Sequence, residues 1–285
     1  MEASAGPLGD QSVRWRRLVA YWLLACAFSW SWWIPLALTD VAVGPGQGWP
    51  SHLPGLLGPA VAAVVVVAVT EGREGLRRLW ARVIRWRVSW WWFVLVLATA
   101  ACALLAYPAA WLSDSAAPTA ADFAAYSGVG AWPVVVMLIY VVVVNGLGEE
   151  TGWRGYLAEG LLGRFGITTT GLIVALPWAL WHLPMFWVVR SFRDFGVAGT
   201  VGWLVGLTAG SIVLAWIYAR SGHSVLIVAL WHTAFNLTSA TDAAAGLPAA
   251  LSSTLVMIAA VAIPVAAGVA RRRNAKSRSG VASPG

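Results

Sequence analysis

The chain has 285 residues, of which 59% are hydrophobic and only 11% are charged, and its mean hydropathy is +0.72. Ordinary soluble domains carry about 25% charged residues, so this composition excludes a soluble globular protein, a disordered chain and a conventional nucleic-acid-binding protein. The net charge of +7 is therefore attributed to membrane topology and to contacts with anionic lipid headgroups.

Eight stretches of the chain are apolar over about 20 residues, the length that a helix needs to cross the hydrocarbon core of a membrane. The predicted fold class is all-α: a polytopic membrane helical bundle of about eight transmembrane helices, with no soluble domain. In chain order, the predicted spans cover residues 17–38, 53–70, 89–112, 131–150, 167–189, 199–219, 224–241 and 249–270.

The basic residues predict the orientation of these spans. If the N-terminus is cytoplasmic, 17 of the 19 Lys and Arg residues fall in cytoplasmic segments, and only Arg190 and Arg193 lie on the outer side. Because one missing span would invert every later loop, this bias favours the span assignment and places both termini in the cytoplasm of a membrane-integral protein. The chain then divides into a cytoplasmic N-terminal segment (1–16), a membrane domain (17–270) with its polar motifs within about 131–241, and a basic, disordered cytoplasmic tail (271–285).

The segment between the second and third spans reads EGREGLRRLWARVIRWRVSW. An α-helix here would place Leu76, Leu79, Trp80 and Val83 on one face and arginines around the rest. This pattern predicts a helix that lies in the headgroup region of the cytoplasmic leaflet. A solvated charged loop is the alternative.

An ionisable residue inside a span costs about 2.5–3.5 kcal/mol on insertion scales, so a buried one indicates a functional site. The first such place is GLGEETGWRGYL, where Glu150 and Arg154 are four residues apart and can form an ion pair along one helical face. Gly148 and Gly152 have the spacing that lets a neighbouring helix approach closely. The alternative is that the fourth span ends at Glu149 and leaves these charges in cytoplasmic water.

Two further spans carry polar residues. LPWALWHLPMFW places His182 well inside the fifth span, and ALWHTAFN places His232 and Asn236 on one face of the seventh. Taken separately, each could be a structural hydrogen-bonding group between helices. At a rise of 1.5 Å per residue, Glu149 reaches the depth of the histidines only if the fourth helix continues through Arg154. We expect this continuation, because it lets the Glu, both His and the Asn converge beside a water-filled cavity.

These residue types support hydrolysis in two versions. A carboxylate beside a neutral His can hold and deprotonate a water molecule, and a second His and an Asn amide can donate to the oxyanion formed on a peptide carbonyl. In the other version, His182 and His232 with Glu149 or Glu150 bind a divalent metal ion such as zinc and leave one position open for water. The chain has no H-E-x-x-H, no G-x-S-G and no pair of Asp residues within spans, which excludes the other intramembrane protease chemistries.

The three motifs resemble those of the CAAX-protease and bacteriocin-processing family, also called the CPBP or Abi family. Its members carry E-E-x-x-x-R, F-x-x-x-H and H-x-x-x-N on successive spans. The matching residues here, in the same order and spacing, are Glu149-Glu150-x-x-x-Arg154, Trp178-x-x-x-His182 and His232-x-x-x-Asn236. The resemblance covers the fourth to seventh spans, and it departs from the family pattern at Trp178, where the family usually has Phe.

The resemblance implies an intramembrane endopeptidase whose substrates are prenylated C-terminal motifs, or leader and bacteriocin-like peptides. The implied roles are water activation by Glu149 and His182, an oxyanion hole of His232 and Asn236, and support by Glu150, Arg154 and Trp178. The expected partners are a membrane-associated peptide or protein and anionic lipid headgroups, without nucleic acid. No cofactor is assigned, and a divalent metal such as zinc stays open.

Two other functions remain open on the sequence alone. A non-proteolytic membrane scaffold or immunity protein could keep the same fold, although such a protein has no need for all four polar motif residues. A small proton-coupled transporter is less favoured, because transporters often contain internal repeats and none is evident in this chain.

Overall fold

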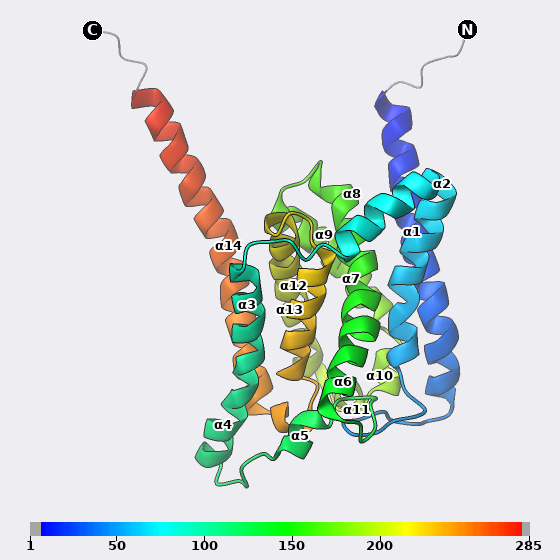
Figure 1. Cartoon of the computed structure of the whole chain (residues 1–285), viewed down its shortest axis with the longest axis vertical. Helices are drawn as coiled ribbons and strands as arrows, with labels where there is room; N and C mark the ends of the chain where they lie inside the picture. Colours follow the sequence, from blue (N-terminus) through cyan, green and yellow to red (C-terminus); the bar gives the residue numbers. More distant parts are fainter. Residues whose placement is uncertain (1–6, 281–285) are drawn as a thin grey trace.

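The computed structural model describes the backbone of residues 7–280 and the side chains of residues 15–269. This part of the chain forms the helical bundle of Figure 1, which confirms the predicted all-α membrane fold. Its helices are α1 (Pro7–Leu38), α2 (Gly58–Val83), α3 (Trp91–Ala101), α4 (Ala106–Leu112), α5 (Ala120–Ala124), α6 (Val134–Val141), α7 (Gly148–Gly152), α8 (Glu159–Leu162), α9 (Ile167–Trp181), α10 (Met185–Val188), α11 (Arg190–Arg193), α12 (Val197–Arg220), α13 (Val225–Leu237) and α14 (Leu247–Gly280).

Six helical stretches of the described chain are long and apolar enough to cross a membrane. They are Trp15–Leu38, Leu53–Val83, Trp91–Leu112, Val134–Leu162, Val197–Arg220 and Leu247–Val269. The count of eight is not confirmed, because the predicted fifth and seventh spans contain the shorter helices α9 and α13. Pro184 explains the early end of α9, since proline lacks a backbone N–H and disfavours helical geometry in the residue before it.

The fourth span is one continuous helical stretch that runs past Arg154 to Leu162. Its segments α6, α7 and α8 are joined by two π-helical turns, η3 (Val142–Leu147) and η4 (Trp153–Ala158). The predicted continuation through Arg154 is therefore confirmed. Single π turns inside α-helices are frequent at functional sites, and here they flank the short segment that carries both glutamates.

A bend at Gly72 separates the membrane-crossing half of α2 from its charged half. Gly72 has a φ of 62°, which glycine adopts readily because it has no Cβ atom. The charged half then passes across the end of the bundle (Figure 1), where Leu79 and Val83 are buried and Trp80 is 61% exposed. The predicted helix is present, and its position in the headgroup region stays a prediction.

The first and last helices extend further than the spans predicted for them. α1 begins at Pro7, a residue favoured at the first helical position, so part of the predicted N-terminal segment 1–16 is helical. α14 continues to Gly280, so residues 271–280 of the tail predicted to be disordered are helical, because Ala, Arg and Lys favour helices. Residues 1–6 and 281–285 lie outside the described residues.

The start of α1 and the end of α14 lie at the same end of the bundle, at the top of Figure 1. An even number of membrane crossings requires this arrangement. The assignment of that end to the cytoplasm stays a prediction from the Lys and Arg distribution.

Glycines let α1 and α2 pack closely against the fourth span. A Cβ atom added to Gly148 would lie 2.9 Å from the Leu56 carbonyl oxygen. One added to Gly152 would lie 2.5 Å from the Pro59 carbonyl oxygen and would also meet the Tyr21 hydroxyl. Only glycine leaves room for these contacts, so the close approach predicted from the small-residue spacing is present in the structure.

Gly152→Ala is expected to lower the thermal unfolding midpoint of the detergent-solubilised protein by several degrees. The added methyl group meets a backbone oxygen, and such overpacking typically costs about 1–3 kcal/mol. Gly163→Ala is the matched control, because no atom lies within 4 Å of a Cβ atom at that position. Tryptophan fluorescence measures both midpoints, and equal midpoints for the two variants would contradict the packing.

Candidate active site

The charged residues of the fourth span lie inside the bundle. Glu149 is 2% exposed, and Glu150 and Arg154 are fully buried. The alternative in which the span ends at Glu149 and leaves these charges in water is therefore wrong. Charges at this depth need partners within the protein, because neither the apolar core nor the lipid can solvate them.

Glu150 joins a cation and an imidazole. Its Oε1 accepts a hydrogen bond from Arg154 Nη1 at 2.9 Å and lies 2.7 Å from His232 Nδ1. The sequence spacing predicted the ion pair with Arg154, and the fold adds His232 from α13 as a third member. With the proton on Nδ1, His232 donates to Glu150, which orients the ring and leaves Nε2 for another partner.

Glu149 is held by two neutral donors. Asn145 Nδ2 donates to Glu149 Oε1 at 3.0 Å, and Trp178 Nε1 donates to Glu149 Oε2 at 2.8 Å. Asn236 Nδ2 donates in turn to Asn145 Oδ1 at 2.5 Å. A chain of side-chain hydrogen bonds thus connects α13, the fourth span and α9, and it holds the carboxylate in one orientation.

Asn145 is a member of this cluster that the sequence analysis did not single out. It is 6% exposed and lies in the π turn η3, four residues before Glu149. The sequence does contain evidence for it. Asn145 is a polar residue within an apolar span, and it lies four residues from Glu149, the spacing at which two side chains meet on one helical face. Its bridge to Asn236 could not be seen, since that residue is 91 positions away.

His182 follows the last residue of α9, which corrects its predicted position well inside a continuous fifth span. Its Nδ1 lies 2.7 Å from the Trp178 carbonyl oxygen, to which an Nδ1–H donates. The rings of Trp181 and Trp203 pack edge-on against the imidazole. Trp178 therefore contacts Glu149 through its indole N–H and His182 through its backbone carbonyl.

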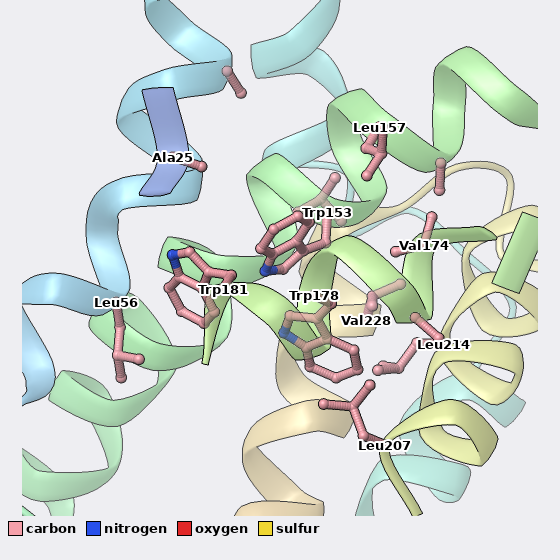
Figure 2. Packing of buried hydrophobic residues seen from close by; sticks show 14 of the residues in the cluster. Ala25, Leu56, Trp153, Leu157, Val174, Trp178, Trp181, Leu207, Leu214 and Val228 are labelled. Carbon is pink, nitrogen blue, oxygen red and sulfur yellow. The ribbon is translucent and has the colours of Figure 1, made fainter. Parts of the chain in front are cut away.

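Trp178 lies at the centre of the cluster. Its ring centroid is 5.7 Å from that of His182 and 5.7 Å from that of His232, and the Arg154 guanidinium lies 4.5 Å from the indole ring. Figure 2 shows this indole within the buried hydrophobic cluster, with Trp153 and Trp181 nearby. A Phe at this position would keep the apolar wall but could not donate to Glu149.

The sequence left open a metal site of His182 and His232 with Glu149 or Glu150, and the geometry does not fit it. Within the described part of the chain, no group of three His, Cys, Asp or Glu side chains is arranged to hold a metal ion. His232 Nδ1 faces Glu150, and both oxygens of Glu149 accept hydrogen bonds from neutral donors.

The fold and the cluster define the class: a helical membrane protein with a polar site inside the bundle. Residues 130–238 match the model of the Rce1-like family, described as type II CAAX prenyl endopeptidase Rce1-like. The chain is also 21% identical over 194 residues to CAAX prenyl protease 2 of Methanococcus maripaludis, a match that covers 65% of this chain and 69% of that protein. These findings confirm the resemblance to the CPBP family and support a protease embedded in the membrane.

Arg154→Met is expected to destabilise the protein by about 3–5 kcal/mol, because it leaves the Glu150 carboxylate buried without its cation. Arg78→Met is the control, since the ion pairs of Arg78 are exposed and such pairs contribute about 1 kcal/mol or less. Denaturant unfolding measures both. If the double variant Glu150→Gln, Arg154→Met recovers part of the lost stability, the unpaired Glu150 carboxylate is the cause of the loss. Equal stability of the two single variants would contradict this account of the pair.

Proposed function

We propose that the protein is an intramembrane endopeptidase that hydrolyses a peptide bond of a membrane-associated substrate with water activated by Glu149 and His182. The observation that supports this most strongly is the meeting of a carboxylate and two imidazoles around Trp178, with the Asn236 amide joined to the carboxylate through Asn145. These groups come from separate parts of the chain, and each is held in orientation by a neighbouring residue.

In the proposed first step, Glu149 accepts a proton from a water molecule as its oxygen attacks the carbonyl carbon of the substrate. Asn145 and Trp178 already hold the carboxylate, so little reorganisation is needed when charge moves. His182 Nε2 accepts the second hydrogen bond of the same water. The proton then passes to the amide nitrogen as the C–N bond breaks, which completes hydrolysis without a covalent intermediate.

His232 and Asn236 are proposed to stabilise the oxyanion of the tetrahedral intermediate. An Asn amide carries two N–H groups, so Asn236 can donate one to Asn145 and the other to the substrate. His232, as an imidazolium, donates Nδ1–H to Glu150 and Nε2–H to the oxyanion. The two carboxylates of α7 are then balanced by two cations, and the buried site carries no net charge.

The proposed substrate is a prenylated C-terminal peptide. The burial of the cluster requires a substrate that reaches the membrane, and the relative from Methanococcus maripaludis is named a CAAX prenyl protease. Leader or bacteriocin-like peptides are the other substrates that the family resemblance implies. The cytoplasmic orientation of both termini is part of the same proposal.

Glu149→Gln is expected to lower the cleavage rate of a prenylated peptide in liposomes by at least about 100-fold, since general-base catalysis contributes roughly 10²–10⁴. Glu74→Gln is the control, because Glu74 lies on the exposed half of α2. Metal content is quantified on the same samples. Equal cleavage by wild type and Glu149→Gln would show that Glu149 is not the general base. A metal that is bound stoichiometrically and is required for cleavage would contradict the metal-free mechanism. A non-proteolytic scaffold would cleave no peptide in the prenylated and unprenylated panels.

Trp178→Phe tests whether the indole N–H positions Glu149. The variant keeps an aromatic side chain, so we expect an unchanged KM and a kcat about tenfold lower, the effect of one hydrogen bond to a charged group. The unfolding midpoint should fall by a few degrees, because Glu149 loses a buried donor. Trp187→Phe is the control, because Trp187 is 56% exposed and outside the cluster. An unchanged kcat would show that Trp178 contributes only its apolar surface.

A further inference from the structure

A long apolar cavity lies apart from the polar cluster, between α3, α12, α13 and α14. Its volume is about 1100 Å³. Trp231 and Phe235 of α13 line it, whereas His232 and Asn236 on the same helix contact the fourth span. Figure 1 shows α3 and α14 on the same side of the bundle, flanking α12 and α13. None of the groups assigned to hydrolysis lines this cavity.

The lining indicates an apolar, elongated occupant. Its walls are mainly hydrocarbon and aromatic, with Leu95, Val213, Trp231, Leu255, Val256 and Ile263 among them. Along α14 the lining runs from Ser252 to Ala267, which corresponds to about 22 Å at the helical rise per residue. One leaflet contributes about 15 Å of the hydrocarbon core, so the lining is long enough to hold a hydrocarbon chain that spans one leaflet.

One end of the cavity carries a cation and an aromatic belt. Arg220 is the last residue of α12, and Trp216 lies one turn before it. Trp91 and Trp92, at the start of α3, line a second cavity of about 570 Å³ that shares Leu95, Trp216 and Arg220 with the first. Tryptophans favour the headgroup level of a membrane and arginine attracts anionic lipids there.

Arg220 has no carboxylate partner among the described residues, whose ion pairs involve other cations. It lies at the end of the bundle that carries the start of α1 and the end of α14. An exposed guanidinium beside an apolar groove and indole rings is suited to bind an amphipathic lipid. That molecule has an anionic head and a hydrocarbon tail.

We propose that this groove binds one anionic glycerophospholipid, with its phosphate on Arg220 and an acyl chain along α14. The substrate's own prenyl chain is disfavoured, since the polar cluster faces away from the groove. The inference concerns a site separate from the one proposed for hydrolysis and does not depend on it.

Native mass spectrometry of the full chain in mild detergent tests the site with phosphatidylglycerol and phosphatidylcholine as probes. We expect one bound phosphatidylglycerol and at least a fivefold preference for it over phosphatidylcholine, the size of effect that one cation near an anionic headgroup gives. Arg220→Gln should abolish the preference. Arg16→Gln is the matched control, because Arg16 is also exposed, near the same end, on α1.

Ala259→Trp fills the groove without a change of charge and should weaken the binding of both lipids. If that variant does not fold, Ala262→Leu makes the same test with less added volume. The proposal is overturned if wild type shows no headgroup preference, if Arg220→Gln behaves like Arg16→Gln, or if filling the groove leaves both lipids bound. Displacement of phosphatidylglycerol by a farnesylated peptide would assign the groove to the substrate instead and would also overturn it.

Discussion

A buried carboxylate pair has to find every partner inside the protein, and most of this structure follows from that requirement. Glu149 and Glu150 are adjacent on one membrane helix, where neither water nor lipid can solvate both charges. Glu150 is balanced by Arg154 one turn later and by His232 from another helix. Glu149 receives neutral donors, Asn145 and Trp178, instead of a cation. Adjacent groups of the same chemistry thus acquire different surroundings.

The backbone of the fourth span makes this division possible. The π turns η3 and η4 interrupt the regular α-helix on both sides of α7, and one of them carries Asn145 while the other carries Arg154. Glycines on the same segment bring α1 and α2 within contact of its backbone. The departure from the family pattern at Trp178 fits this scheme, because its indole N–H supplies a hydrogen bond that a phenyl ring cannot.

Several features could be predicted from the sequence because they depend on local spacing or on composition. The membrane class follows from the scarcity of charge, and the ion pair of Glu150 with Arg154 follows from their four-residue separation. The continuation of the fourth helix followed from requiring four polar residues to reach one depth. The number of spans could not be predicted from apolar length alone, since a run such as 167–189 is long enough for a span whether or not Pro184 ends the helix within it.

The sequence by itself determined which polar groups are present, their order, and the family that their motifs resemble, because these are properties of residue identity and spacing. Only the tertiary structure decided which groups meet. His232 pairs with Glu150 and Asn236 reaches Asn145 because α13 packs against the fourth span. The shape of the groove at Arg220 likewise depends on how α3 and α14 stand against α12 and α13. Contacts between helices distant in the chain are set by packing in three dimensions, and no periodicity within a single helix specifies them.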